Sequence, residues 1–186
     1  MRIAVFCGSS TGNDVAYINE AKKLGKFLAH KKVDLVYGGG KVGLMGTIAD
    51  AVLENGGKVF GVIPEYLQEK EIEHRGLTEL HIVADMHERK AKMAAMADAF
   101  VALPGGAGTL EEIFEVWTWA QLGHHVKPVA FYNVNGFYDP LKEMINSMSA
   151  SGFIKSSYID MLIHTADPET LLSAIKGYKA PLKKWT

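Results

Sequence analysis

Short apolar runs that alternate with helix-periodic segments constrain this sequence most strongly. Runs of strand length, rich in Val, Ile and Phe, occur at residues 3–7, 33–37, 59–63, 79–83, 99–103, 129–132 and, more weakly, 162–164. Helical spacing of apolar side chains covers roughly 14–31, 43–55, 86–97, 109–122, 140–150 and 168–176. Strands and helices that alternate in this way are typical of βα units and a parallel sheet. The sequence therefore predicts a doubly wound α/β domain with a mostly parallel sheet of about seven strands.

Turn and cap residues support several of these boundaries. The pair Gly56-Gly57 closes one predicted helix, because glycine is favoured just past a helix C-terminus. The pairs Asp139-Pro140 and Asp167-Pro168 each open another helix as an N-cap followed by a first-turn proline. Asp85 and Glu88 resemble a capping box at the start of the helix at 86–97.

Length and charge predict one globular domain without a polyanionic partner. The chain has 186 residues, which suffices to bury a core without disulfides or metal ions. We expect a single nucleotide-binding domain over residues 1–178 and a short tail over 179–186. A formal net charge of −1 gives no field that would attract nucleic acid or an anionic membrane, so we expect neither as a partner. The single cysteine, Cys7, and an N-terminus unlike a signal peptide predict a cytoplasmic protein.

Three glycine-rich loops follow predicted strands, at residues 8–12, 38–43 and 104–109. Ligands of doubly wound sheets bind outside the carboxyl ends of the strands, where all three loops fall. Glycine lets the backbone approach a ligand closely, and a helix that begins just afterwards offers N–H groups to an anion. The loops therefore predict a phosphate site. The residues expected to contribute are Ser9, Gly39, Gly40, Gly43, Gly105, Gly106, Ala107, Gly108 and Thr109.

The loop at 38–43 is ambiguous by itself. It satisfies the dinucleotide pattern G-x-G-x-x-G, but it follows the second strand instead of the first, and a tight βα turn would give the same pattern. A Walker A motif is excluded, because no Gly-Lys-Ser/Thr follows four spacer residues. The second glycine loop, at 104–109, favours one compact phosphorylated molecule, such as a mononucleotide or a sugar phosphate.

Two roles are open for Glu112. The segment from Thr109 to Glu112 matches a capping box, in which the glutamate accepts a hydrogen bond at the helix N-terminus. Alternatively, Glu112 and Glu115 lie on one helix face and place two carboxylates at the mouth of the loop. Arg89 and Lys90 fall at the same edge of the sheet, although a basic pair on a helix is usually solvated.

Three motifs together resemble one family. PGGAGTLEE at 104–112, MHERK at 86–90 and YGGGKVGLMG at 37–46 are similar to the LOG ("Lonely guy") family of cytokinin riboside 5′-monophosphate phosphoribohydrolases, long mislabelled lysine decarboxylases. The resemblance covers nearly the whole chain. It implies a modified Rossmann fold that forms a homodimer and needs no metal or other cofactor. It also implies hydrolysis of the N-glycosidic bond of AMP, often N6-modified, to the free base and ribose 5-phosphate.

The resemblance also assigns roles by position. Arg89 and Glu112 become the catalytic pair, which favours the catalytic role of Glu112. A carboxylate stabilises the oxocarbenium-like sugar formed in glycosidic cleavage, whereas a guanidinium acts through its charge. A non-catalytic nucleotide or cofactor carrier of the same fold is the alternative, and a carrier has no need of such a carboxylate. The substrate site then takes in Glu71, Lys90, the 106–112 loop, Glu115 and Thr118.

Other reactive side chains are not assigned to the site. His124 and His125 are adjacent, so a helix points them apart and they do not form an i, i+4 metal pair; we expect a surface or interface pair. Cys7 ends a predicted strand and is expected to be a buried apolar residue instead of a nucleophile. Trp117 is expected to pack in the core.

Overall fold

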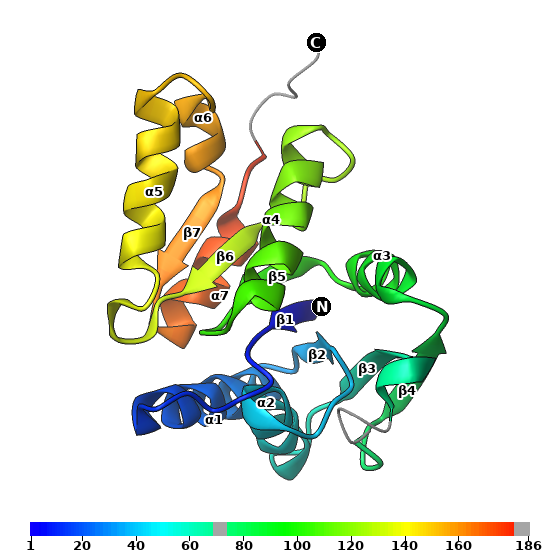
Figure 1. The fold of residues 1–186 in the computed structure, drawn as a ribbon. Coiled ribbons are helices and arrows are strands. Elements are labelled where there is room, and N and C mark those ends of the chain that lie inside the picture. The colour runs from blue at the N-terminus through cyan, green and yellow to red at the C-terminus, as the bar shows by residue number, and fades with distance from the viewer. Residues whose placement is uncertain (69–73, 181–186) are drawn as a thin grey trace.

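The computed structural model describes residues 1–68 and 74–180; Glu71 and residues 181–186 of the predicted tail lie outside the described residues. Within that range, seven parallel strands form one sheet in the order β4-β3-β2-β1-β5-β6-β7 (Figure 1). The predicted fold class and all of the predicted strands are confirmed. The strands are β1 (Arg2–Phe6), β2 (Asp34–Tyr37), β3 (Val59–Pro64), β4 (Glu79–Val83), β5 (Ala99–Ala102), β6 (Val129–Tyr132) and β7 (Leu162–Thr165).

Helices cover both faces of the sheet, as a doubly wound fold requires (Figure 1). One face carries α1 (Val15–His30), α2 (Gly43–Glu54) and α7 (Pro168–Gly177), and the other carries α3 (Met86–Met96), α4 (Ala107–Gln121), α5 (Asp139–Ala150) and α6 (Ser156–Ile159). The six predicted helices are confirmed. The short α6 and the 3₁₀ turns η1 (Glu65–Leu67) and η2 (Val134–Gly136) were not predicted, because such short elements show no helical period. Across the described ranges, no helix is both long and apolar enough to pass through a lipid bilayer.

Two apolar cores, one on each face of the sheet, explain why the strands read as continuous apolar runs. On β2, Leu35 and Tyr37 belong to the core beneath α1 and α2, whereas Val36 belongs to the core beneath α3 and α4. Successive side chains of a strand point to opposite faces, and here both faces are covered by helices. The central strands therefore show no alternation of apolar and polar residues, whereas the edge strand β4 (ELHIV) is partly exposed and does alternate.

The predicted ends of α2, α3 and α7 are confirmed, with Asp85 capping α3, and the predicted start of α5 is wrong. Asp167 caps α7 with its carboxylate, and Gly56 lies just beyond α2 with a φ of 77°. Asp139, in contrast, is not an N-cap, because α5 begins one residue earlier than predicted and includes it. The Asp139 carboxylate instead accepts a hydrogen bond from the side chain of Asn133, at 2.7 Å.

The three glycine loops meet at the topological switch point of the sheet, between β1 and β5, where the strand order reverses. The N–H of Gly8 donates to the carbonyl of Pro104 at 3.1 Å, and the N–H of Leu44 donates to the carbonyl of Gly8 at 3.1 Å. Gly43, with a φ of 60°, lies so close to the backbone of Ser9 and Ser10 that a side chain would collide with it. The predicted convergence of the loops at one edge of the sheet is therefore confirmed.

Candidate active site

A hollow of about 360 Å³ opens at this edge, between the loops after β1 and β5 and the helix α3. Its walls come from elements that are distant in the sequence, and they include both residues of the predicted catalytic pair, Arg89 and Glu112. The described residues that line it are Cys7, Gly8, Ser9, Met45, Leu67, Met86, Arg89, Gly106, Ala107, Gly108, Thr109, Glu111 and Glu112.

The start of α4 settles whether Glu112 caps its helix. The N-cap of α4 is Gly106, whose extended backbone (φ −92°, ψ −157°) begins the helix three residues earlier than a capping box at Thr109 requires. Glu112 is thus the sixth residue of the helix, beyond the first turn in which the free N–H groups lie. The capping-box interpretation is wrong, and the side chain of Glu112 lines the hollow instead.

The N-terminus of α4 is open towards the hollow. Asp14, Asp85 and Asp167 cap α1, α3 and α7, whereas within the described residues no side chain caps α4. The first-turn residues of α4, from Ala107 to Thr109, line the hollow. Free N–H groups and the positive end of the helix dipole favour an anion at such a place. The predicted phosphate cradle therefore has the local structure that it needs.

Arg89 is buried instead of solvated. It lines the hollow and is only 4% exposed. Its Nε donates to the carbonyl of Val62 at 3.1 Å, and its Nη2 donates to the carbonyl of Gly38 at 2.8 Å. Its Nη1 approaches the sulfur of Met86 at 3.6 Å. A long side chain held at several points has lost most of its rotamer freedom, so the guanidinium is presented to the hollow in a fixed orientation.

Lys90 is buried as well, but it faces α4. It is 7% exposed and pairs with the carboxylates of Glu111 and Glu115, the latter at 3.0 Å. Burial by itself would lower the pKa of Lys90, but the hydrogen bonds and charges of the two glutamates outweigh it and raise the pKa. Among the described residues, neither Lys90 nor Glu115 lines the hollow, whereas Glu111 does. The helical spacing predicted Glu115 as the second carboxylate beside Glu112, but the structure places Glu111 at the hollow instead.

Cys7 lies at the floor of the hollow, after β1. Burial raises the pKa of its thiol well above the ordinary range; the charge of Glu112 raises it further, and that of Arg89 opposes this. A thiol in this state is not a nucleophile at neutral pH, as the sequence predicted. Cys7, Arg89 and Glu112 all line the same hollow.

Only some of the remaining predicted site residues line the hollow. Ser9 lines the hollow, whereas Gly39, Gly40 and Gly43 are described but do not line it. Thr118 is exposed on α4, also away from it. The apolar lining residues Met45, Leu67 and Met86 were not predicted, because an apolar side chain near a site gives the same sequence signal as one in the core.

His125 and Trp117 each bind a backbone carbonyl, whereas His124 is exposed. His125 lies on the carbonyl of Val116, with its Nε2 at 2.8 Å, and Trp117 is buried with its indole N–H donating to the carbonyl of Tyr158. Within residues 1–68 and 74–180, no group of three or more His, Cys, Asp or Glu is arranged to hold a metal ion.

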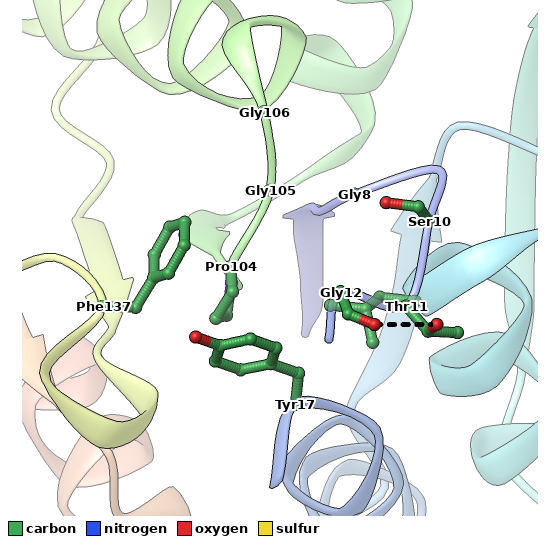
Figure 2. Close-up of a pocket in the computed structure, with 10 residues that line it drawn as sticks. Gly8, Ser10, Thr11, Gly12, Tyr17, Pro104, Gly105, Gly106 and Phe137 are labelled. Carbon is green, nitrogen blue, oxygen red and sulfur yellow. Dashed lines mark hydrogen bonds between the residues drawn. The ribbon is translucent and has the colours of Figure 1, made fainter. Parts of the chain in front are cut away.

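A second, smaller hollow of about 250 Å³ shares Gly8 and Gly106 with the first (Figure 2). Its sides are mostly apolar, and the rings of Tyr17 and Phe137 meet edge to face across it at 5.8 Å. Figure 2 shows both rings next to Pro104. The first hollow is thus polar and holds the charged side chains, whereas the second is mostly apolar.

A doubly wound sheet with an open helix N-terminus and charged side chains at its switch point defines a Rossmann-like protein of the nucleotide-binding type. The family model described as "Possible lysine decarboxylase" matches residues 45–175. The chain belongs to this family and, within it, to the cytokinin riboside 5′-monophosphate phosphoribohydrolases, as its relatives show.

Three of these relatives come from plants and a bacterium. The chain is 50% identical over 177 residues to a probable cytokinin riboside 5′-monophosphate phosphoribohydrolase of Oryza sativa subsp. japonica, covering 95% of this chain and 78% of that protein. It is 49% identical over 177 residues to the Arabidopsis thaliana enzyme of that name, covering 95% and 83%. It is 49% identical over 176 residues to the Rhodococcoides fascians enzyme, covering 94% and 89%. The predicted family resemblance is confirmed.

Solved structures with the same fold include the molybdenum cofactor carrier protein of Chlamydomonas reinhardtii. Its TM-score is 0.72 at 20% identity, over 94% of this chain and 95% of that one. The molybdenum cofactor binding protein of Rippkaea orientalis gives a TM-score of 0.68 at 19% identity, over 94% of each chain. At this level of identity the likeness concerns the fold alone.

Proposed function

We propose that this protein is a nucleoside 5′-monophosphate phosphoribohydrolase. It hydrolyses the N-glycosidic bond of AMP or an N6-modified AMP, and it releases an adenine-type base, which includes cytokinins, and ribose 5-phosphate. The observation that carries this proposal is the presence of Arg89, Glu112 and the open N-terminus of α4 in one hollow, in a chain about half identical to relatives named for this reaction.

The 5′-phosphate binds at the start of α4. Backbone N–H groups of Gly106 to Thr109 donate to its oxygens, and the Thr109 hydroxyl adds a further donor. Gly105 supports this loop from behind: a methyl group there would overlap the Thr109 side chain and lie 2.8 Å from the backbone nitrogen of Gly8. This site selects monophosphates, because binding depends on a compact dianion instead of a long phosphate chain.

Glu112 acts on the sugar. It lies about one helical turn beyond the phosphate cradle, which is the spacing from a 5′-phosphate to the ribose ring. As the glycosidic bond breaks, positive charge develops on the anomeric carbon, and a carboxylate beside it stabilises that charge or orients the attacking water. Removing the charge while keeping the shape of the side chain therefore abolishes turnover.

Arg89 acts through its charge. A guanidinium does not give up its proton near neutral pH, so Arg89 stabilises negative charge on the departing base or on the phosphate instead of serving as a general acid. The neighbouring apolar side chains of Met45, Leu67 and Met86 provide a surface on which a purine packs. We assign the base to this side of the hollow, opposite the phosphate cradle.

Several further assignments belong to this proposal. The enzyme acts as a homodimer, needs no metal or other cofactor, and works in the cytoplasm. Glu71 and Thr118 contact substrate, as the family resemblance implies, and Gly39, Gly40 and Gly43 contribute to the edge of the site. Lys90 and Glu115 contribute indirectly, by fixing α3 against α4. Lysine decarboxylation is not proposed, because that chemistry needs a lysine bound to pyridoxal phosphate and the described walls of the hollow include no lysine.

The test is release of ribose 5-phosphate from AMP, N6-isopentenyl-AMP, IMP, GMP and CMP, with adenosine and ATP as controls. We expect release from the AMP substrates only, and loss of release in Glu112→Gln with nucleotide binding and melting temperature preserved. The matched control is Glu143→Gln, an exposed glutamate of α5, which keeps the full rate. Full activity of Glu112→Gln would refute the role of this carboxylate. Binding of AMP without release by the wild-type protein would indicate a carrier or sensor.

A further inference from the structure

The guanidinium of Arg89 is held between the residue that follows β2 and a residue within β3. Gly38 directly follows β2, and Val62 lies in β3, and the carbonyls of these two residues accept from Nη2 at 2.8 Å and from Nε at 3.1 Å. The last pair of the ladder between β2 and β3 is Tyr37 with Gly61. Both carbonyls therefore lie just beyond the point where these strands stop pairing with each other. The end of the ladder leaves two acceptors that an arginine side chain can bridge.

We propose that the glycine turn at 38–43 is a clamp that positions Arg89 and that Gly38 is a positioning residue for the reaction. The proposal rests on the proposed function for its kinetic consequences. It assigns the turn a role different from the one that its G-x-G-x-x-G pattern suggests, which is direct binding of phosphate.

The need for glycine at position 38 is steric. A methyl group at Gly38 would overlap Nη2 of Arg89, and it would lie 3.0 Å from Cζ of Arg89 and 3.2 Å from the sulfur of Met45. The guanidinium is thus packed directly against the Cα of Gly38. The atom that a methyl group meets first is the end of a side chain and not backbone, so substitution displaces Arg89 before it disturbs the sheet.

Two other glycines of the turn, Gly39 and Gly43, pack against neighbouring segments of the protein. Gly39 lies against Gly61 and accepts from the N–H of His74 at 3.1 Å, and Gly43 lies against the backbone of the loop after β1. Gly38, Gly39 and Gly43 thus contact protein, and within the described residues no glycine of the turn lines the hollow. These contacts fix the Gly38 carbonyl and hence the orientation of the arginine.

The first experiment detects the clamp without relying on activity. The Nε–H of Arg89 is followed by ¹H–¹⁵N spectroscopy of the full chain, with Arg89→Lys used to assign its signal. We expect a slowly exchanging Nε–H in the wild-type protein, and loss of its protection in Gly38→Ala. The matched control is Gly177→Ala at the end of α7, where a methyl group meets no atom within 4 Å, and this variant keeps the wild-type signal.

The second experiment separates positioning from phosphate binding. Because displacement of a catalytic group by about 1 Å costs on the order of 100-fold in rate, we expect kcat of Gly38→Ala to fall about 100-fold. Inhibition by ribose 5-phosphate should change by less than about twofold, because the phosphate cradle at the start of α4 is untouched. Gly177→Ala should match the wild type in both measurements.

The outcomes are distinct. An unchanged Arg89 signal together with a near-wild-type kcat in Gly38→Ala overturns the clamp. So does a loss of ribose 5-phosphate inhibition with kcat preserved, which returns the turn to phosphate binding. If Gly38→Ala does not fold, Arg89→Lys is the second test. A single ammonium group cannot reproduce the hydrogen bonds of the guanidinium to two carbonyls. A wild-type kcat in Arg89→Lys therefore refutes the proposal. If the wild-type enzyme releases no ribose 5-phosphate, the proposed function fails while the Nε–H measurement still tests the clamp.

Discussion

Replacing Lys90 with methionine tests how α3 and α4 are held together. The two helices carry the proposed catalytic residues, and Lys90 joins them through Glu111 and Glu115. Methionine preserves most of the volume and flexibility of the lysine side chain, so the substitution removes mainly the charge. The glutamates remain, and each keeps a negative charge without its shared cation.

The size of the effect follows from exposure. Breaking a fully buried ion pair costs about 3–5 kcal/mol, and an exposed pair contributes at most about 1 kcal/mol. The side chain of Lys90 is 7% exposed and those of Glu111 and Glu115 are 53% and 26% exposed. After the substitution water can solvate the Glu111 carboxylate, whereas Oε2 of Glu115, which faces Lys90, stays buried. We therefore expect a loss of about 1–2 kcal/mol in the free energy of unfolding. For a chain of this size, that lowers Tm by roughly 2–8 °C.

The pH dependence has a defined sign. The pKa of Lys90 is raised in the folded protein, so the folded state holds this proton more tightly than the unfolded state. The stabilisation by Lys90 is thus complete below its ordinary pKa of 10.5 and is lost as pH rises through the folded value. The free energies of unfolding of the wild type and Lys90→Met, measured in urea, should differ at pH 8. They should become equal at pH values above the folded pKa of Lys90.

The control and the refuting result are specific. Lys92→Met, an exposed lysine of the same helix, should leave stability unchanged. Equal stability of Lys90→Met and the wild type at pH 8, or a difference that persists at high pH, would refute the role of the ion pairs. Because Lys90 does not line the hollow, KM for AMP should change by less than about threefold. A large rise in KM would instead make Lys90 a substrate ligand.

Two further predictions concern the glycine loop and a histidine. Gly105→Ala should abolish activity and lower Tm, because its methyl group would overlap the Thr109 side chain. A methyl group at Gly108, on α4, meets no atom within 4 Å, so Gly108→Ala should stabilise the protein by about 0.5–1 kcal/mol in thermal unfolding. Destabilisation by Gly108→Ala would contradict this. Burial lowers the pKa of His125, so the folded state binds its proton less tightly, and stability should fall as pH decreases below the ordinary value of 6.5. His125→Gln should lose less stability between pH 7.5 and 5.5 in urea unfolding, and an unchanged loss would exclude His125 as a cause.

The sequence by itself determined the fold class and the edge of the sheet at which the candidate site lies. Continuous apolar runs predicted the strands, because a parallel sheet covered on both faces needs apolar side chains on both sides of each strand. Glycines after the first, second and fifth strands predicted where a ligand binds, because loops at the carboxyl ends of parallel strands lie at one edge. The motif at 104–112 and the segment at 86–90 identified the family. These signals are local, so they can be read along the chain.

Only the tertiary structure decided the roles of the charged residues. Arg89 meets the carbonyl of Gly38, 51 positions away, and Lys90 meets Glu111, 21 positions away, so neither burial nor pairing could be read from the local pattern. The capping-box pattern around Glu112 failed because Gly106 starts the helix earlier, in a conformation that the packing of its loop against Gly8 sets. A helix turns by 100° per residue, so its position against the neighbouring elements determines whether a side chain lines a hollow, pairs with another charge or faces water.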